Sequence, residues 1–513
     1  MPLSGQKLPV APPERLHATF LFVLAILGRS HVLIAPDALV LGWRQADMLS
    51  VARNFARHGY RLFWPQIDWG GAGPGFVEME FPVLPWVGAI LQRLFGPHEV
   101  LSALVPLLAS FALVFAVAAL ARRVFGADAG FWAGAFAALS PLTSWYTATC
   151  QGDGTMVLCS VLGVHFLLAW SSAKRPRDLV LSGAFTSLAV LLKPTALLVG
   201  LPLLYVFSLA WGRTFAKRPV FWLYGVLVLL PPCLWYAHAH GLYLEYGNTF
   251  GVLKGGYEKL SSVALLTLPG FWLRIAGRTA LYVLTPAVAI LWAVGLCRPQ
   301  RGPETLLFHV WTAALFVYVV LVGRGNYEMG HYQLPFLPPA AALAGAAAVD
   351  LGSRLGGGRR GHARRIAGLA VLASSFVGAT LVHGRRVVAS TLADAHRLRE
   401  NGREVARVTP PGSLILVSTG YGGSRKPGEI DTPPEVFAHA DRRGWFVGFP
   451  WLTPEAVEAR RREGARALVV PGEALPFFTG ERADALRALY PALPTSADVL
   501  VLDLAGTAPD LRK

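Results

Sequence analysis

The sequence predicts an all-α polytopic membrane bundle of about eleven transmembrane helices, followed by a small C-terminal α/β domain. Three observations support this prediction: the composition, the recurrence of long apolar segments, and a change of pattern in the tail. The 513 residues are 54% hydrophobic and 15% charged, and the mean hydropathy is +0.46. Soluble domains carry about 25% charged residues. Because a soluble protein could not cover this much apolar surface, lipid must be one of its solvents.

Apolar segments that could cross a bilayer recur through most of the chain. The fifth and sixth are separated only by Lys193, and Pro194 follows, so one long kinked helix is the alternative there. No small-residue cleavage site follows the first segment, which is therefore expected to stay as a signal anchor. The candidate spans are residues 17–36, 101–121, 129–150, 154–172, 179–192, 194–212, 219–237, 279–297, 305–323, 334–349 and 366–382.

Basic residues predict the orientation of these spans. With the N-terminus inside, every inner loop is basic, whereas the short outer loops carry only Lys193 and Arg324. Two long loops, residues 37–100 and 238–278, then lie outside, as does the tail. We therefore expect a multi-pass protein of the cytoplasmic (inner) membrane with a cytoplasmic N-terminus and a periplasmic or extracellular C-terminal domain. The net charge of +16 lies mostly in short clusters between apolar runs, which favours contact with membrane lipids and not with nucleic acid.

The tail, residues 385–513, follows a different pattern from residues 1–384. Short apolar runs alternate with charged, helix-forming stretches, which predicts a small α/β domain with a mainly parallel sheet and a core of its own. The Gly-rich segment at 419–424 does not match a dinucleotide fingerprint and is predicted to be a plain loop. The predicted strands are 413–418, 467–470 and 499–504, and the predicted helices are 454–463 and 481–489.

The first outer loop opens with GWRQAD at residues 42–47 and continues with MLSVARNFARHG at 48–59. The apolar spacing of the second stretch predicts an amphipathic helix on the membrane surface. Asp47 stands where a helix N-cap would stand, and capping is its structural explanation. Arg44, Asp47 and Arg53 nevertheless lie together beside the mouth of the first span, which favours a functional role.

The rest of this loop, at residues 65–86, places Asp68, Glu78 and Glu80 among Trp, Gly and Pro residues. Glycines let a backbone approach a ligand closely, and Trp faces stack on sugar rings. A solvated loop is rarely so aromatic and so short of Ser and Lys. We therefore predict a functional surface here.

Further ionisable residues lie at span ends on the same outer side. Asp153 separates the third and fourth spans, and Lys193 follows the fifth; charges at such positions are costly and often functional, although a snorkelling Lys is the structural alternative. Arg324, His331 and Tyr332 lie at the outer entrance of the tenth span. A cavity with an anion clamp and a base suits transfer from a phospholipid-linked donor to a hydroxyl or amine. Nothing in the sequence matches a Walker loop, a nucleophile elbow or a zinc motif.

Over roughly residues 17–350 the chain resembles the integral-membrane GT-C glycosyltransferases, specifically the bacterial relatives of dolichyl-phosphate-mannose protein mannosyltransferases and of lipid A aminoarabinose transferases. Asp47 occupies the place of the family's first acidic residue, and Glu80 with Phe81 and Pro82 resembles its second acid and x-Pro step. Asp153 and Lys193 match the acid after the third span and the Lys after the fifth. The HYQLPFLP run at 331–338 resembles the family's Tyr-x-Leu-Pro segment.

Two departures qualify this resemblance. Many relatives have Lys directly after the second acid, where this chain has Phe81, so another cation must contact the phosphate; Arg44 or Arg53 is the candidate. The family's first acid is often part of an acidic pair, whereas Ala46 precedes Asp47 here.

The resemblance implies a membrane glycosyltransferase that moves a sugar from a polyprenyl-phosphate donor to a lipid, glycan or protein acceptor with inversion. Asp47 would be the general base and Glu80 the second candidate catalytic residue. No nucleotide and no cofactor would be required, and a divalent metal is not indicated. The expected substrate-binding residues are Arg44, Arg53, Glu78, Asp153, Lys193, Arg324, His331 and Tyr332.

Two other classes of function remain as alternatives. A transporter or lipid flippase predicts charged residues at span centres and internal repeats, and the sequence has little of either. A non-catalytic subunit for polysaccharide assembly is the other alternative, which loss of the first-loop acids in close relatives would favour.

Overall fold

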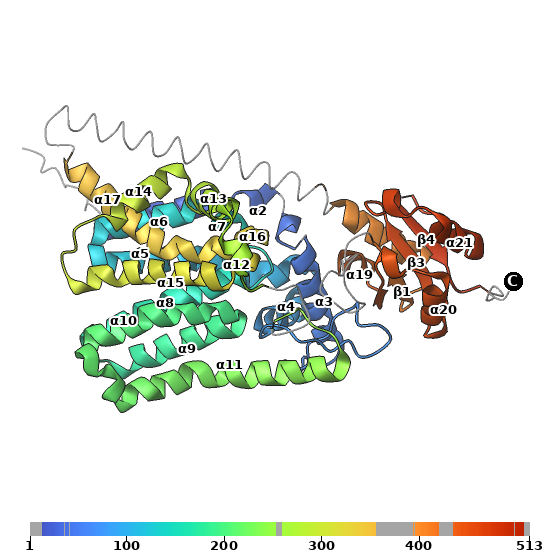
Figure 1. Ribbon diagram of the computed structural model, residues 1–513, viewed down its shortest axis with the longest axis horizontal. Coiled ribbons are helices and arrows are strands. Elements are labelled where there is room, and N and C mark those ends of the chain that lie inside the picture. Colours follow the sequence, from blue (N-terminus) through green and yellow to red (C-terminus); the bar gives the residue numbers. More distant parts are fainter. Residues whose placement is uncertain are drawn as a thin grey trace, which may run out of the picture.

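The computed structural model describes residues 13–34, 36–40, 42–252, 259–354, 393, 396–419, 434–496 and 498–506. It is an elongated helical bundle with a small α/β domain at one end (Figure 1). This confirms the predicted fold class. The eleventh predicted span, 366–382, lies outside the described residues, and so does nearly all of the Gly-rich segment 419–424.

Most of the described chain is helical. The first part of the bundle comprises α1 (Pro13–Gly28), α2 (His31–Ile34), η1 (Pro36–Leu39), α3 (Trp43–Arg57), α4 (Val83–Phe95), η2 (Glu99–Ala103), α5 (Leu104–Phe125), α6 (Ala127–Leu139), α7 (Pro141–Tyr146), α8 (Asp153–Ala173) and α9 (Pro176–Leu192). It continues with η3 (Pro194–Val199), α10 (Gly200–Trp211), η4 (Gly212–Lys217), α11 (Pro219–Tyr246), α12 (Val263–Leu266), α13 (Pro269–Arg278), η5 (Thr279–Leu284), α14 (Pro286–Leu296), η6 (Pro303–Leu306), α15 (Leu307–Leu321), α16 (Gly323–Glu328), η7 (Gly330–Phe336) and α17 (Leu337–Arg354).

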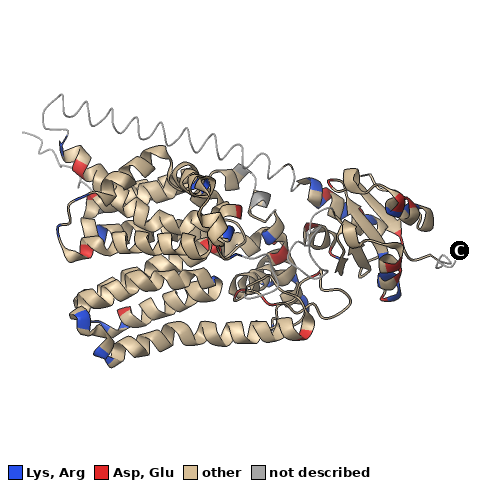
Figure 2. Cartoon of the chain, viewed as in Figure 1, with Lys and Arg blue, Asp and Glu red and all other residues tan. Residues whose placement is uncertain are grey.

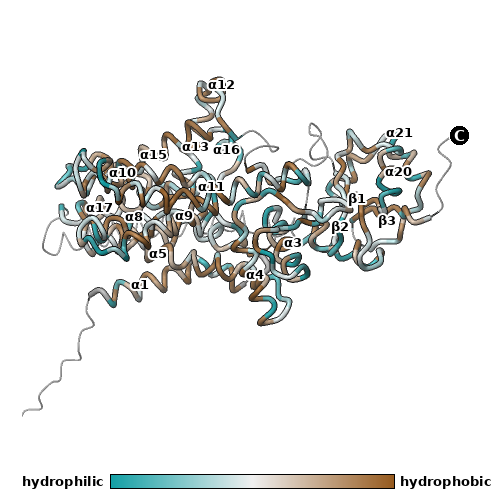
Figure 3. The backbone as a smooth tube through the Cα atoms, turned by 90° about the horizontal axis from the view of Figure 1, so that it is seen from below, coloured by the Kyte–Doolittle hydropathy of each residue, from teal (hydrophilic) through white to brown (hydrophobic). Residues whose placement is uncertain are grey.

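Within the described residues, six helices are long and apolar enough to cross a membrane, or seven if the pair Pro269–Leu284 and Pro286–Leu296, bent by 108°, is one span. Two shorter apolar helices, Arg15–Gly28 and Val83–Phe95, accompany them. Apolar side chains are exposed along α11, where Trp222 and Leu234 face outward, and Figure 3 shows brown tube along the bundle helices. Lipid explains this exposure. The chain is therefore a multi-pass membrane protein, and the count of about eleven spans stays a prediction.

The expected third span, 129–150, is interrupted. Helix α6 ends at Leu139, and Ser140 caps the six-residue helix α7 by accepting a hydrogen bond from the backbone N–H of Thr143. Pro141 occupies the first position of α7. Because proline has no backbone N–H, it could not make the hydrogen bond that would extend α6 past this point.

The fifth and sixth predicted spans are two helices. Lys193 has extended backbone (φ −156°, ψ 123°) between α9 and η3. Basic residues gather where α8 meets α9 and where α10 meets α11, at the end of the bundle remote from the C-terminal domain (Figure 2). Since α9 starts and α10 ends at this basic end, the two helices run in opposite directions. The alternative of a single kinked helix is wrong.

The C-terminal domain has a four-stranded sheet with strand order β2-β1-β3-β4. Strand β1 pairs in parallel with β2 and β3, and β4 is antiparallel to β3. The mainly parallel sheet is thus confirmed, and β2 is a strand that the sequence prediction missed. The elements are β1 (Leu414–Val417), α19 (Pro434–Ala440), β2 (Arg443–Phe446), η8 (Phe449–Trp451), α20 (Pro454–Arg462), β3 (Ala465–Pro471), η9 (Leu475–Phe477), α21 (Glu481–Leu489) and β4 (Val499–Asp503).

The two faces of this sheet belong to different cores. One face packs Leu416 and Leu468 against Val457 of α20 and Leu486 of α21. The other face, with α19, shares a core with α3 of the first outer loop. The members of this shared core include Ile415, Val417, Val436, Phe437, Leu49, Val51 and Phe55. The tail therefore has a core of its own on one face of the sheet and shares a core with the first outer loop on the other face. That residues 385–513 form a separable domain stays a prediction. We call the contact between α3 and α19 the α3–α19 seam.

Candidate active site at the domain junction

Helix α3 carries the first group of predicted site residues. It begins at Trp43 with Gly42 as N-cap, so Asp47 lies in its second turn and does not cap it. The structural explanation for Asp47 is therefore wrong. The predicted helix is present. It does not lie on the surface as expected, because both of its faces are buried: Met48 and Phe55 on one face, and Ser50 and Asn54 on the other. The polar face is covered by the loop that follows and by the C-terminal domain.

Asp47 is buried, with 1% of its surface exposed. The indole Nε1 of Trp69 donates a hydrogen bond of 3.0 Å to Oδ1. The nearest guanidinium nitrogen of Arg44 is 4.0 Å from Oδ2, too far for a hydrogen bond. Among the described side chains, none donates to Oδ2. Burial raises the pKa of Asp47 to about 7, although Arg44 and the Trp69 hydrogen bond oppose it. A carboxylate with this pKa is well matched to proton abstraction at neutral pH.

Glu80 has the opposite environment. Its Oε1 is 3.6 Å from an Arg44 nitrogen and 3.6 Å from Lys193 Nζ. Lys193 Nζ is also 3.4 Å from an oxygen of Asp153. Burial alone would raise the pKa of Glu80, but Arg44, Lys193 and Lys259 hold it at about 2. Glu80 therefore stays ionised and holds cations in place. We call Arg44, Glu80, Asp153 and Lys193 the paired cluster.

Backbone contacts explain why these distant residues meet. The carbonyl of Leu191, two residues before Lys193, accepts hydrogen bonds from the Phe81 N–H at 3.0 Å and from the Tyr236 hydroxyl at 2.9 Å. Trp235 Nε1 donates to the Met79 carbonyl at 3.1 Å. The loop segment around Glu80 is thus fixed to the break between α9 and η3. Asp153, the first residue of α8, completes the cluster from the opposite side.

The paired cluster lines one narrow cavity of about 30 Å³, whose other lining residues include Gln151 and Pro82. Tyr332 lies beside it, with its ring centroid 5.9 Å from Lys193 Nζ. His331 stacks on Tyr146 with ring centroids 4.6 Å apart. The structure therefore brings together seven of the predicted residues, namely Arg44, Asp47, Glu80, Asp153, Lys193, His331 and Tyr332.

Three other predicted residues have different contacts. Arg53 is 2.8 Å from an Asp68 oxygen and 3.0 Å from an Asp441 oxygen, and it donates to the Ala438 carbonyl at 2.9 Å. These contacts link the loop to the C-terminal domain, so the expected phosphate contact of Arg53 is not supported. Arg324 is 47% exposed and pairs with Glu328 at 3.0 Å on the surface of α16.

Glu78 is fully buried and joins the two outer loops. It accepts a hydrogen bond from the Thr249 hydroxyl and lies 3.1 Å from His240 Nδ1. Backbone hydrogen bonds reinforce this link, from Glu78 N–H to Asn248 O at 3.0 Å and from Phe250 N–H to Glu78 O at 2.9 Å. These contacts give Glu78 a role in holding the loops together, and they place its carboxylate apart from the paired cluster's ion pairs.

Sequence reasoning missed several neighbours of the site. Lys259 donates to the Gly251 carbonyl at 2.8 Å. Burial and the nearby cations Lys193 and Arg44 lower its pKa to about 8, while Glu80 opposes them. No sequence pattern distinguished Lys259 from the other basic residues of the predicted outer loop 238–278, which are Lys254, Arg274 and Arg278. The Arg44 guanidinium lies over the Phe250 ring at 4.4 Å, and no sequence pattern indicated that contact.

Comparison with known proteins identifies the class of this fold. Residues 79–236 match the family model described as dolichyl-phosphate-mannose-protein mannosyltransferase. The matched range includes Glu80, Asp153 and Lys193, whereas Arg44 and Asp47 precede it. A search of curated protein sequences gives no significant match. The predicted resemblance to GT-C membrane glycosyltransferases is confirmed at the level of the fold by the family model and by solved structures.

Two solved structures illustrate the match. ArnT from Cupriavidus metallidurans bound to undecaprenyl phosphate is 15% identical, covers 96% of this chain and 99% of its own, and superposes with a TM-score of 0.63. The archaeal oligosaccharyltransferase AglB from Archaeoglobus fulgidus, in complex with an inhibitory peptide and a dolichol-phosphate, is 12% identical, covers 94% of this chain and 72% of its own, and has a TM-score of 0.60. At these identities the likeness establishes a shared fold.

Proposed function

We propose that the protein is an inverting membrane glycosyltransferase that transfers a sugar from a polyprenyl-phosphate donor to an acceptor. The observation that carries this proposal is the pairing of a buried, elevated-pKa Asp47 with the adjacent paired cluster. Asp47 supplies a base, and the paired cluster supplies cations that can bind a phosphate. The solved ArnT and AglB structures contain undecaprenyl phosphate and a dolichol-phosphate, which supports a donor of this kind here.

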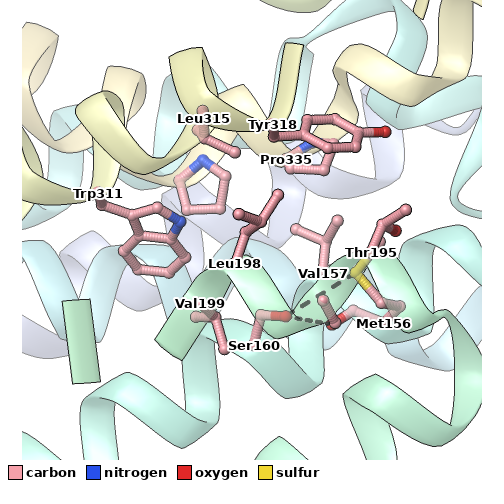
Figure 4. A pocket seen from close by; sticks show the side chains of 12 residues that line it. Met156, Val157, Ser160, Thr195, Leu198, Val199, Trp311, Leu315, Tyr318 and Pro335 are labelled. Atoms are coloured by element: carbon pink, nitrogen blue, oxygen red, sulfur yellow. Dashed lines mark hydrogen bonds between the residues drawn. The ribbon is translucent and has the colours of Figure 1, made fainter. Parts of the chain in front are cut away.

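A small apolar pocket of about 30 Å³ near the paired cluster would contact only a short part of such a donor's lipid. It lies between α8, η3, α15 and the η7–α17 segment (Figure 4). Three of its lining residues lie two or three positions after a site residue. They are Met156 after Asp153, Thr195 after Lys193, and Pro335 after Tyr332. Trp311 and Leu315 of α15 close the opposite side. The hydroxyl of Ser160 is satisfied by the Met156 carbonyl at 2.9 Å, which leaves a mainly apolar wall.

The proposed reaction is a single displacement. The acceptor oxygen or nitrogen forms a bond to the anomeric carbon while the bond from that carbon to the phosphate oxygen breaks, and polyprenyl phosphate leaves with the electron pair. Asp47 takes the proton of the acceptor. Arg44 and Lys193 stabilise the charge that develops on the leaving phosphate. Glu80 and Asp153 keep these two cations in position. Attack opposite the leaving group inverts the anomeric carbon.

The proposed setting is the outer face of the cytoplasmic membrane. The candidate site lies at the end of the bundle that carries α3, α4 and the C-terminal domain, and the basic end lies opposite (Figures 1 and 2). Because basic loops stay on the cytoplasmic side, the site and residues 385–513 are expected outside.

Incubation of the purified protein with a panel of polyprenyl-phosphate sugars tests the proposal. We expect release of polyprenyl phosphate from one donor, and a faster release when an acceptor is added. The same donors in sealed vesicles test the transporter alternative. Movement of the lipid across the bilayer with its sugar–phosphate bond intact, and without release, would contradict the proposal.

A further inference from the structure

A groove of about 450 Å³ opens between α14 and α17, far from the candidate active site. Both helices end at the basic end of the bundle, remote from the C-terminal domain (Figures 1 and 2). Apolar and charged side chains line the groove together, and they include Ala293, Val294, Leu351, Arg298, Asp350 and Arg354. We call this space the α14–α17 groove.

The groove exists because α17 extends beyond the end of α14. The two helices touch closely at Gly295, where an added Cβ would lie 2.5 Å from the Leu343 carbonyl oxygen. Helix α14 ends one residue later, whereas α17 continues to Arg354, about 16 Å past this contact at 1.5 Å per residue. The α17 residues that line the groove all belong to this extension. The last turns of α17 therefore lack α14 beside them.

Positive charge exceeds negative charge at this place. Arg298 donates to the Asp350 carboxylate through Nε and, at 3.1 Å, through Nη2, and its guanidinium lies over the Phe125 ring at 5.2 Å. A nitrogen of Arg301 is 3.8 Å from the same carboxylate, and Arg354 follows Asp350 by one turn of α17. One carboxylate thus faces three guanidinium groups. Arg354 also favours the C-terminus of α17 electrostatically, but that explains neither the other two arginines nor the groove.

The apolar wall of the groove continues along the outside of α14. Val294 is 54% exposed and Ile290, one turn earlier on the same face, is 66% exposed. Leu351 of α17 is 49% exposed beside them. Such side chains are stable only against lipid. A ligand that uses both parts of the groove must therefore be amphipathic, with an anionic head and an apolar chain.

We propose that the α14–α17 groove binds a membrane phospholipid with a net negative headgroup. Its phosphate lies between Arg301 and Arg354, and an acyl chain lies along Ile290 and Val294. Guanidinium groups suit phosphate because they can donate two parallel hydrogen bonds to it. Basic pockets between membrane helices on the cytoplasmic side bind headgroups of this kind, and the basic end is expected to face the cytoplasm. The groove shares no residue with the candidate active site, so the inference is independent of the proposed reaction.

Cys297 provides a reporter for the test, because it lines the groove and is exposed. Cys150 and Cys159 are buried, so full-length Cys233→Ser retains one exposed cysteine. The measurement is the rate of maleimide labelling in detergent, with dioleoyl phosphatidylglycerol, dioleoyl phosphatidylcholine or inorganic phosphate added. We expect phosphatidylglycerol to slow labelling about tenfold at ten times its dissociation constant, as mass action requires. The other two additions should leave the rate unchanged.

Arg301→Gln combined with Arg354→Gln removes the two exposed cations and keeps the pair between Arg298 and Asp350. The phosphatidylglycerol concentration for half-protection should rise about 30-fold, because each basic residue near an anionic lipid contributes roughly a factor of five. Arg213→Gln combined with Lys217→Gln is the matched control, since both side chains are exposed at the same end of the bundle, on η4. The control should keep the wild-type value.

Each of the remaining outcomes would overturn the inference. Equal protection by phosphatidylcholine would indicate apolar contact without recognition of the headgroup. Protection by inorganic phosphate alone would indicate an anion site and not a lipid site. An equal loss in the two double variants would indicate general attraction to the basic end, and absence of protection by phosphatidylglycerol would exclude the site. Cleavage of a sugar donor, or its absence, affects none of these results.

Discussion

The carboxyl groups of Asp47 and Glu80 lie on either side of Arg44, yet their surroundings differ in kind. Glu80 contacts two cations, and its pKa is held at about 2. Asp47 has one indole donor and a guanidinium at 4.0 Å, and its pKa is raised to about 7. Asp47 is buried, with 1% of its surface exposed, and Glu80 is mostly buried, with 15% of its side chain exposed. Burial alone therefore does not determine whether a carboxylate can act as a base. The number of nearby cations and their distances set its pKa.

This contrast assigns different roles to Asp47 and Glu80, which the sequence analysis had both named as candidate catalytic residues. A carboxylate that remains ionised under all working conditions can position cations and repel a misplaced anion. A carboxylate near its pKa can accept a proton and release it in the next cycle. We accordingly assign proton transfer to Asp47 and cation placement to Glu80.

The largest expected effect is that of Asp47→Asn. This change removes the base and keeps the size of the side chain, so turnover should fall about 100-fold or more, because a positioned general base contributes roughly 10²–10⁴. Donor binding should stay close to the wild-type value. The measurement is the rate of polyprenyl phosphate release at saturating donor. Near-normal turnover would remove Asp47 from the mechanism and transfer the catalytic assignment to Glu80.

The next effect is that of Lys193→Met, which removes a cation between Glu80 and Asp153. Donor affinity should fall by about 10- to 100-fold, as expected for loss of a charged hydrogen bond of about 1.5–3 kcal/mol. Arg324→Ala is the matched control: it removes an exposed cation whose ion pair contributes at most about 1 kcal/mol, and donor affinity should not change. Equal losses in both variants would indicate a general effect of charge and not a phosphate site.

A third prediction concerns pH. The raised pKa of Asp47 means that the base is ionised above about pH 7 and becomes protonated below it. Activity should therefore be high above this value and fall by about tenfold per pH unit below it. Glu80, with a pKa of about 2, should contribute nothing in this range. A profile flat from about pH 5 to 8 would contradict the base assignment.

The smallest expected effect on activity is that of Arg53→Ala. The change leaves the buried Asp68 without its ion pair and leaves Asp441 paired with Arg57 alone, so the free energy of unfolding should drop by about 1–3 kcal/mol. Turnover of the folded protein should change less than about twofold, within the range of ordinary surface variants. Thermal unfolding and initial rates on the same preparation provide the measurement. A loss of donor affinity without a loss of stability would restore the phosphate contact first expected for Arg53.

The sequence predicted the parts of the molecule governed by local patterns. The apolar runs identified the bundle, and the alternation of short apolar and charged stretches identified β1, β3, β4, α20 and α21. Strand β2 was missed because RGWF lacks the β-branched residues that mark the other strands. The break at Ser140 and Pro141 was a local signal that the apolar composition concealed.

The site could be predicted only in part. Asp153 and Lys193 were identified because charges at span ends are costly and rare. Asp47 and Glu80 were identified by the unusual composition of the first outer loop and by the family resemblance. The partners of Arg53 could not be foreseen, since Asp441 and Ala438 are distant in sequence. The same reason hid the position of Lys259 near Lys193 and Arg44. Their proximity depends on how the outer loops and the C-terminal domain fold together, which no local pattern encodes.

The ion pair between Arg57 and Asp441 joins residues 384 positions apart, and this separation has a consequence for biosynthesis. A ribosome makes α3 early, but its partner α19 emerges only after all of the bundle helices described here have been synthesised. Contacts between residues so far apart in sequence form late and slowly. During that interval the polar face of α3 lacks its contacts with the C-terminal domain. A nascent chain should therefore acquire its complete junction only when the last segment has been translocated, so truncated products of interrupted translation should be inactive.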